Sequence, residues 1–266
     1  MAVNTEKNTE NTFITTVRSF LIEIGELSYF ARRFFNEVFR PPFESKEFFK
    51  QCFNVGNRSL PLIAVTAFII GLVFTLQSRP TLEEFGALSW MSSMVSISIV
   101  REIGPIITAL VCAGRISSGI SAEIGSMRVS EQIDAMEVSG TNPFKYLVVT
   151  RIAATTLMLP LLVIVGDAIS IYASYLVEHF KGNVSFHLYF NEVFEALKFR
   201  DIMPATIKTF FFGFAIGLVG SFKGYFCKKG TAGVGIAANS AVVFTSMLLF
   251  FIDFIAVFIS NIIYHE

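Results

Sequence analysis

Ionisable side chains inside long apolar stretches are the first candidates for chemistry in this chain of 266 residues. They are Arg101, Glu102, Asp167, Lys208 and Asp253. A charge at membrane depth costs free energy, so such a side chain usually faces a cavity, a partner or a transport path. The alternative is that these groups join helices by hydrogen bonds or reach to the membrane surface. For Lys208 and Asp253 both interpretations stay open.

Arg101 and Glu102 are the strongest of these candidates because they are adjacent. Neighbouring side chains on a helix project about 100° apart, so both cannot face lipid. Gly104-Pro105 follows directly, and a proline there must kink the helix or open its hydrogen-bond ladder. We therefore expect Arg101 and Glu102 to line a binding site or cavity. Gln77, at the end of the first apolar stretch, is a weaker candidate for the same site.

A polar loop over residues 114–143 separates two of the apolar stretches. Its charged residues include Arg115, Glu123, Arg128, Glu131, Asp134 and Glu137. Ser130 is suited to cap the start of a helix, and Glu131 and Asp134 would then lie in the first turn, where the helix dipole favours negative charge. Gly140 is suited to end that helix. The loop is therefore predicted to contain a short helix with defined ends.

The same loop combines an apolar seam with acidic residues. Ile120, Ile124 and Met127 form one stripe at helical spacing, and Val129, Ile133 and Met136 form another. A helix with an apolar seam and an acidic outer face can lie in a groove on a soluble domain. The alternative is a helix resting on the membrane, but the cytoplasmic leaflet is negatively charged and attracts basic segments. We predict that the loop docks on a soluble partner.

Long apolar stretches must position these residues. Apolar residues make up 53% of the chain and charged residues 16%, against roughly 45–50% and about 25% in soluble domains. Windows of about 20 apolar residues, the length that crosses a bilayer, occur at about 60–78, 92–113, 146–177, 203–226 and 239–263. We predict an all-α membrane protein with five transmembrane helices, the first ending at 77–80. The expected divisions are a disordered tail at 1–11, an amphipathic interfacial helix at 12–42 and a transmembrane domain at 43–266.

Two amphipathic segments flank or interrupt these spans. From Phe13 to Val38 apolar residues recur at helical spacing, and this Phe-rich face suits the bilayer interface. Packing on a protein surface is the alternative. The residues expected to enter the interface include Phe20, Ile24, Phe34 and Phe35. The second segment, 183–201, is predicted to form an external interfacial or capping helix.

The distribution of lysine and arginine predicts the orientation of the spans. These residues are concentrated before the first window and after the second and fourth windows, whereas the loop after the first window has only Arg79. Cytoplasmic loops are the ones enriched in lysine and arginine. We therefore expect a cytoplasmic N-terminus, a cytoplasmic loop at 114–143 and an external C-terminus.

Several classes of protein are excluded or disfavoured. The 21 basic and 21 acidic residues give a net charge of zero, so nothing indicates nucleic acid. Cys52, Cys112 and Cys227 match neither a disulfide framework nor the spacing of metal ligands. No phosphate-binding loop of the form G-x-x-x-x-G-K-[ST] occurs, so we expect no ATP hydrolysis and no catalytic residue on this chain. A cleaved signal peptide is not expected.

A long sequence pattern carries a family resemblance. The stretch AGRISSGISAEIGSMRVSEQIDAMEVSGTNPFKYLVVTRIAATTLMLPLL closely resembles the core of MlaE/YrbE-type permeases, which belong to MCE-linked ABC lipid transporters. REIGP at 101–105, VGN at 55–57 and LQ at 76–77 are also similar to that family. The resemblance runs from about residue 48 to the end of the chain and is strongest over 100–165.

The resemblance implies a homodimer in which each chain has an interfacial helix, five transmembrane helices and a cytoplasmic coupling helix between the second and third spans. Each coupling helix would dock on an ATPase subunit that binds ATP and Mg, so no cofactor is expected on this chain. An MCE-domain protein would sit on the outer side. Carried over, the coupling element is 123–142, with Glu123, Arg128, Glu131, Asp134, Glu137 and Gly140 as its expected contact residues.

The resemblance also implies a substrate and a location. Members of the family move phospholipids between the inner and outer membranes of diderm bacteria, in connection with the lipid asymmetry of the outer membrane. Chloroplast relatives move lipid at the envelope. The expected location of this chain is therefore a bacterial inner membrane, with the C-terminus in the periplasm.

Rival functions follow from the buried acids. Glu102, Asp167 and Asp253 could form the relay of a proton-coupled secondary transporter, which would leave the acidic loop without a role. Asp167 and Asp253 could instead form an intramembrane aspartyl enzyme, although the sequence lacks a glycine-flanked aspartate signature in the right context and neither acid has an obvious paired partner. A purely structural scaffold for envelope proteins would leave Arg101 and Glu102 unexplained.

Overall fold

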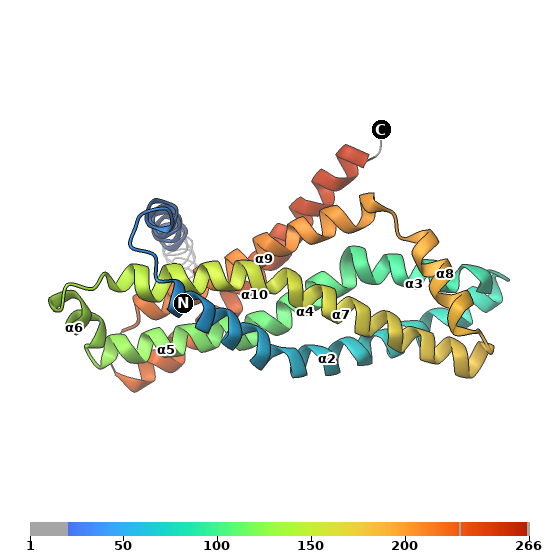
Figure 1. The fold of residues 1–266 in the computed structure, drawn as a ribbon, viewed down its shortest axis with the longest axis horizontal. Coiled ribbons are helices and arrows are strands. Elements are labelled where there is room, and N and C mark those ends of the chain that lie inside the picture. Colours follow the sequence, from blue (N-terminus) through green and yellow to red (C-terminus); the bar gives the residue numbers. More distant parts are fainter. Residues whose placement is uncertain (1–20, 229, 265–266) are drawn as a thin grey trace, which may run out of the picture. The chain divides into compact units, whose positions relative to one another are not determined.

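The computed structural model describes residues 21–228 and 230–264 of the chain (Figure 1). It divides the chain into two compact units, Met1–Phe43 and Glu44–Glu266. Every regular element in the described ranges is helical. The predicted all-α fold is therefore confirmed.

In the first unit, residues 21–38 form a helix that ends before Pro41. The predicted start of this helix, and Phe20 with it, lies outside the described residues. Ile24 and Phe35 expose their apolar side chains, whereas Phe34 is buried. The helix thus presents apolar surface that water disfavours, as expected of an interfacial helix.

The second unit contains the spans. Its elements are α2 (Ser45–Glu84), η1 (Leu88–Trp90), α3 (Met91–Ser98), η2 (Ile99–Ile103), α4 (Gly104–Cys112), η3 (Ala113–Ser117), α5 (Ser118–Val129), α6 (Gln132–Val138), η4 (Phe144–Val149), α7 (Thr150–Gly182), α8 (Phe186–Ala196), α9 (Phe199–Tyr225) and α10 (Thr231–Tyr264). Within the described residues, five helical runs are long and apolar enough to cross a membrane: Ser45–Glu84, Leu88–Val129, Phe144–Gly182, Phe199–Tyr225 and Thr231–Ile263. The predicted number of spans is confirmed, and each run is longer than its apolar window.

The first span differs most from the expectation that it ends at 77–80. Helix α2 is 40 residues long and continues through Pro61 and Pro80 to Glu84. A proline removes only one backbone donor, and packing against a neighbouring helix can offset that loss. Here Arg79, just beyond the window, binds Glu178 of α7 with an N–O distance of 2.8 Å. The extension of α2 beyond the apolar window therefore rests on tertiary contacts that local sequence does not reveal.

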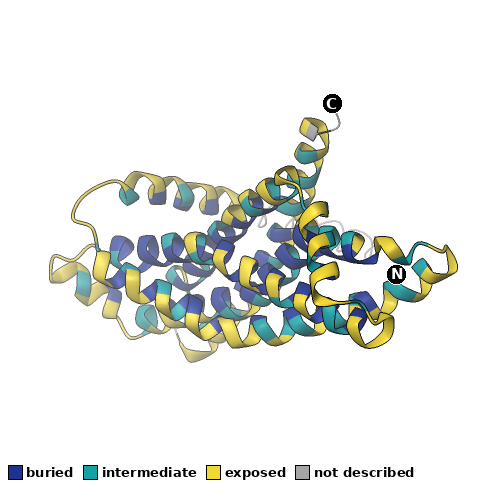
Figure 2. Cartoon of the chain, turned by 45° about the vertical axis from the view of Figure 1, so that its right-hand side comes forward, coloured by how far each residue is buried: buried dark blue, intermediate teal, exposed yellow. Residues whose placement is uncertain are grey.

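The core of this unit lies among the second, third and fourth spans. Its fully buried side chains include Ile124 of α5, Ile133 of α6, Leu147 of η4 and Phe212 of α9. Helix α10 is different, because only 11% of its most apolar window is buried, against 61% for the third span. The C-terminal half of α10 is largely exposed (Figure 2). Such an apolar face needs lipid or another protein to cover it.

Helix α8 lies at the end of the unit opposite α6 (Figure 1). Ser185 caps its start by accepting a hydrogen bond from the Leu188 amide. Tyr189 is fully buried, and its hydroxyl donates to Ser174 Oγ at 2.7 Å. Burial raises the pKa of Tyr189 to about 12, so the hydroxyl keeps the proton that it donates. The predicted amphipathic segment 183–201 is thus a helix over 186–196, and residues 199–201 instead begin α9.

Candidate functional site

The second span is irregular where Arg101 and Glu102 lie. Residues Ile99–Ile103 form a π-helical turn, η2, and Gly104-Pro105 opens the next α-helix. Pro105 has no N–H group, so the regular hydrogen-bond ladder cannot run through it. A π-turn shifts the side chains that follow it and is frequent at functional sites. The sequence therefore places both charged residues at a break in a transmembrane helix.

Glu102 is joined to two other spans through Lys208. The Lys208 ammonium, on α9, lies 2.6 Å from Glu102 Oε2 and 3.0 Å from Asp253 Oδ1 of α10. The Lys208 side chain is only 4% exposed, whereas those of Glu102 and Asp253 are 45% and 20% exposed. One buried cation is thus neutralised by two carboxylates from two other spans. A buried ammonium of this kind is stable only while it is paired.

Arg101 points to a different partner. Its Nε lies 3.7 Å from Asp201 Oδ1, and half of its side chain is exposed. Asp201 also accepts a hydrogen bond from the Lys198 amide, which holds it in the first turn of α9. The distance of 3.7 Å makes the Arg101 pair an ion pair without a hydrogen bond. Arg101 is therefore the more readily available of the two predicted residues for a ligand.

All of these charged residues except Asp253 line one cavity of about 230 Å³. Its wall is made of Arg101, Glu102, Arg200, Asp201, Pro204, Ala205, Lys208, Ala256, Val257, Ser260 and Asn261. Three cationic and two acidic side chains stand beside a wall of small and aliphatic residues. This volume is below the roughly 300–1,000 Å³ of pockets that enclose a drug-sized ligand. It suits a polar headgroup whose apolar part extends beyond the cavity.

Asp167 forms no hydrogen bond or ion pair with this group in the described structure. Its Oδ1 atom is buried and has no hydrogen-bond partner in the described structure. Asp167 packs against Gly104, because a Cβ atom built on that glycine would overlap Asp167 Oδ1. Position 104, next to the helix break, therefore needs a glycine, because the Asp167 carboxyl group of the third span occupies the space that a side chain would take. Asp167 lines a second, mostly apolar cavity of about 210 Å³ between the second, third and fourth spans.

The structure brings together some predicted site residues and separates others. Arg101 and Glu102 share a cavity, whereas Gln77 is exposed on α2 and does not line it. Lys208, Asp253 and Asp201 complete the polar site, and sequence analysis did not assign them to it. A usable signal existed for Lys208, because a single lysine at the depth of three acids in other spans is the obvious neutralising partner.

The predicted coupling loop is built from two helices. Helix α5 continues the second span to Val129, and α6 covers Gln132–Val138. The chain turns between them at Glu131, which has φ = 59°. Arg128 Nη1 donates to Asp134 Oδ1 at 2.6 Å across the turn, although both side chains are well exposed. The second span therefore extends from the membrane directly into the loop.

Two expectations for this loop need correction. Ser130 does not cap α6, because its hydroxyl donates backwards to the Ser126 carbonyl at 2.8 Å and Glu131 occupies the capping position. The apolar seam is not free for a partner either. Ile124 and Ile133 are fully buried in the core of the unit, and Met136 packs against the same core. The reason is that α5 continues a span, so its apolar side belongs to the helix bundle.

The end of α6 agrees with the prediction. Gly140 has φ = 79°, a left-handed conformation that other residues adopt with strain. The Gly140 amide donates to Glu137 O and the Thr141 amide to Met136 O, both at 3.0 Å. This pair of hydrogen bonds is the Schellman motif that ends many helices. The glycine therefore fixes where α6 stops.

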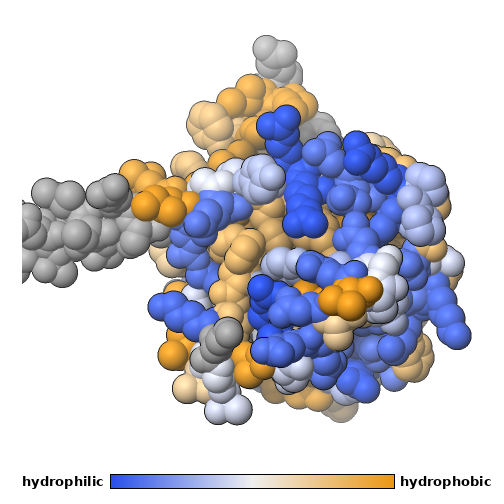
Figure 3. Space-filling view, turned by 90° about the vertical axis from the view of Figure 1, so that its left-hand side faces the viewer, coloured by the Kyte–Doolittle hydropathy of each residue, from blue (hydrophilic) through white to orange (hydrophobic). Residues whose placement is uncertain are grey.

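What α6 offers to a partner is acidic. Its exposed residues are Glu131, Gln132, Asp134, Ala135, Glu137, Val138 and Ser139. Val138 is 91% exposed and is an apolar side chain within this acidic surface. Figure 3 shows the end of the unit where α5 and α6 lie, with hydrophilic side chains gathered around a small apolar patch. Glu123, on α5, is exposed beside this surface and binds Arg151.

Comparisons with known proteins agree with this arrangement. A sequence model described as Permease MlaE matches residues 48–259, which include most of the cavity wall, the loop and most of each span. A probable ABC transporter permease protein of Rickettsia bellii is 38% identical over 226 residues, or 85% of this chain and 87% of the relative. A protein of the same description from Synechocystis is 35% identical over 199 residues, or 75% of each chain. Protein TRIGALACTOSYLDIACYLGLYCEROL 1, chloroplastic, of Arabidopsis thaliana is 32% identical over 206 residues, or 77% of this chain and 59% of that protein.

Proposed function

The chain belongs to the MlaE permease family, and from this membership we propose that it moves phospholipids between the inner and outer membranes of a diderm bacterium. It is an integral membrane protein of the ABC-permease class. In the proposal, ATP is hydrolysed on a separate ATPase subunit that holds ATP and Mg. Two copies of this chain form a homodimer, and an MCE-domain protein sits on the periplasmic side.

The observation that carries the substrate class is the cavity at the helix break. A phospholipid headgroup presents a phosphate and, in many lipids, an amine. Arg101 and Arg200 can bind the phosphate, and Glu102 or Asp201 can accept hydrogen bonds from the amine. Ala256 and Val257 provide an apolar wall for the start of an acyl chain. A cavity with both signs of charge at membrane depth is expensive to maintain without a ligand that uses it.

The observation that supports an ATPase partner is the acidic surface of the loop. Helix α6 is joined through α5 to the span that carries Glu102. Nucleotide-driven closure of two ATPase subunits would move both loops, and the spans beside them would then change the cavity. Such a transition requires a ligand that binds one state better than the other. ATP bound at the ATPase provides that difference.

The proposed location follows from charge distribution. The lysine and arginine residues before α2 and in the loop at 114–143 favour a cytoplasmic N-terminus and a cytoplasmic α6. The C-terminus would then be periplasmic in the inner membrane. The exposed apolar face of α10 is consistent with cover by a second copy of the chain in the proposed homodimer.

Lipid transfer in a reconstituted complex tests the proposal. Arg101→Ala and Glu102→Ala should each reduce lipid crosslinking and transfer by about tenfold or more, the loss expected when a charge-assisted hydrogen bond to a ligand is removed. Glu84→Ala, an exposed acid outside the cavity, is the matched control and should transfer lipid normally. Unchanged lipid handling in both cavity variants, in complexes that still assemble, would remove these residues from the site.

The rival proton-coupled transporter lacks comparable support. Glu102 and Asp253 share Lys208, and no hydrogen bond in the described structure links either of them to Asp167. The proposed intramembrane aspartyl enzyme meets the same difficulty, since Asp167 has no acidic partner there. An ATPase subunit that fails to copurify with the chain would favour the secondary transporter over our proposal.

A further inference from the structure

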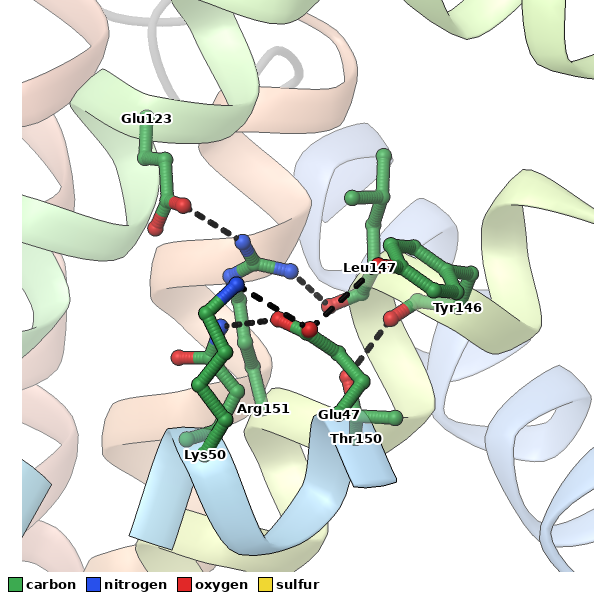
Figure 4. Close-up of polar contacts among 8 residues, drawn as sticks. Glu47, Lys50, Glu123, Tyr146, Leu147, Thr150 and Arg151 are labelled. Atoms are coloured by element: carbon green, nitrogen blue, oxygen red, sulfur yellow. Dashed lines mark hydrogen bonds and ion pairs between the residues drawn. The ribbon is translucent and has the colours of Figure 1, made fainter. Parts of the chain in front are cut away.

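A second buried charge cluster lies at the end of the unit near α6, far from the cavity. Arg151, the second residue of α7, is only 2% exposed. Its Nη2 atom lies 2.8 Å from Glu123 Oε1 of α5, and its Nη1 atom donates to the Leu147 carbonyl at 2.8 Å (Figure 4). Arg151 therefore connects the third span to the helix that leads into the loop.

The guanidinium of Arg151 is incompletely satisfied. Its Nε atom is buried and has no hydrogen-bond partner in the described structure. Arginine offers five N–H donors in a rigid planar arrangement, and a buried donor without a partner costs free energy. A different arrangement of the same residues that gave this donor an acceptor would therefore be favoured.

Glu47 of α2 is the candidate for that acceptor, and no hydrogen bond or ion pair joins it to Arg151 among the described residues. Its side chain is buried, and its charge interacts with that of Arg151. Gln51 Nε2 donates to Glu47 Oε1 at 2.7 Å, and the Tyr146 hydroxyl donates to Oε2 at 3.3 Å. Lys50 Nζ lies 3.2 Å from the same Oε2 atom, so Glu47 already has one cationic partner and Arg151 would be its second. Figure 4 shows Arg151 between Glu47 on one side and Glu123 on the other. The first, second and third spans thus each contribute to one cluster.

The carboxylates of Glu123 and Glu47 differ in their exposure and in the helix that carries them. Glu123 is 54% exposed and belongs to the helix that would follow a moving loop. Glu47 is 7% exposed and belongs to the long first span. Removing the only partner of a buried charge is strongly unfavourable, because the remaining charge is uncompensated. With Glu47 on the other side of its guanidinium, Arg151 can leave Glu123 and then pair with Glu47.

We propose that Arg151 is a positioning residue that transmits movement of the α5–α6 loop to the spans by exchanging Glu123 for Glu47. This inference rests on the proposed function, because the movement originates at the ATPase. While Arg151 binds Glu123, the loop and the third span move together. When the loop is displaced, Arg151 binds Glu47 and ties the third span to the first. The cluster is thus a two-state element that the loop and the spans both influence.

The ratio of lipid transferred to ATP hydrolysed measures this transmission. Glu123→Gln and Glu47→Gln each confine the guanidinium to one carboxylate, so both should keep ATP hydrolysis and lower the ratio about fivefold or more, the usual lower bound for coupling between sites. A purely structural role predicts instead that yield, hydrolysis and transfer decline together and that the ratio is unchanged. A wild-type ratio in both variants overturns the proposal.

The Arg79–Glu178 pair offers a matched control. It is a buried ion pair with N–O distance 2.8 Å that joins α2 to the far end of α7. Glu178→Gln removes a comparable interaction between the same two helices, about 40 Å along α7 from Arg151 at 1.5 Å per residue. Its lipid-to-ATP ratio should equal that of the wild type, even where thermal stability decreases. A lowered ratio in this variant contradicts a specific role for Arg151.

A second measurement does not depend on the ATPase. Double-mutant cycles on the thermal stability of the purified chain compare Arg151→Met with Glu123→Gln and with Glu47→Gln. Sharing of Arg151 predicts non-additive stability effects in both cycles. Coupling to Glu123 alone overturns the exchange. If the wild type binds no ATPase or moves no lipid, the proposed function fails, while the two cycles still decide whether Arg151 is shared.

Discussion

At the scale of residues, the polar groups inside the spans are distributed over three separate contacts. Lys208 is shared by Glu102 and Asp253, Arg101 lies near Asp201, and Asp167 packs on Gly104. Only the first contact neutralises a fully buried charge. The cavity therefore owes its charge balance to Lys208, and its accessible ligand-binding group is Arg101.

Gly104 provides a direct test of the packing beside the cavity. In Gly104→Ala, the added methyl group would overlap Asp167 Oδ1 and would lie 2.9 Å from both Asp167 Cγ and the Ile99 carbonyl oxygen. We expect a loss of about 1–3 kcal/mol in the free energy of unfolding, the usual cost of overpacking. Thermal unfolding in detergent measures this loss.

Two companion variants make the result specific. Gly114→Ala places its methyl group where no atom of the described residues, apart from the adjacent helix backbone, lies within 4 Å, so it should leave stability unchanged or slightly increased. Adding Asp167→Ala to Gly104→Ala removes the overlapping carboxyl group and should recover part of the lost stability. Equal stability of the Gly104 and Gly114 variants would show that Asp167 does not pack on Gly104.

The positions of these groups follow from the sequence only in part. Charges within apolar windows predicted Arg101 and Glu102 as site residues, because lipid excludes charge whatever the fold. The pairing of Glu102 with Lys208 depends on which spans are neighbours and on their relative rotation. A single sequence does not contain that information. The same is true of Arg151, which sequence analysis did not single out.

At the scale of elements, the loop shows which local signals determine structure. Gly140 ends α6 as predicted, since its left-handed conformation is a backbone requirement that local sequence satisfies. Ser130 was misassigned, because the second span continues as helix to Val129 and the serine lies at that helix's end. The apolar stripes were found correctly, but the bundle buries them and leaves the acidic surface for a partner.

This acidic surface predicts the effect of charge reversal. Glu131→Lys with Asp134→Lys should weaken association with the ATPase by about tenfold or more at low salt, and added salt should reduce the difference, since interface charges act mainly through long-range electrostatics. Copurification at two ionic strengths measures both effects. Membrane insertion of the variant should be normal.

A matched charge reversal at the C-terminal end of α2, far from α6 in the sequence, provides the control. Glu83→Lys with Glu84→Lys makes the same change in net charge on residues that are also exposed. It should leave ATPase association at the wild-type level. Full retention of the ATPase by the Glu131 and Asp134 variant would contradict docking through α6.

At the scale of the whole molecule, the second span connects the two proposed sites. It is one helical run over 88–129 that carries Glu102 at the cavity and Glu123 at the loop. At 1.5 Å per residue these two positions are about 30 Å apart. A change at the loop therefore has a continuous path to the cavity, with π-turns at η2 and η3 where the run can deform.

Accessibility of α6 from the two sides of the membrane is the most direct test of this account. Ala135→Cys in α6 and Glu84→Cys at the end of α2 are compared in a background with Cys52, Cys112 and Cys227 replaced, using a membrane-impermeant maleimide. Both positions are exposed. The account predicts that Glu84→Cys reacts from outside intact cells and that Ala135→Cys reacts only after the membrane is opened. Labelling of Ala135→Cys from outside would contradict it, because no ATPase could then reach α6.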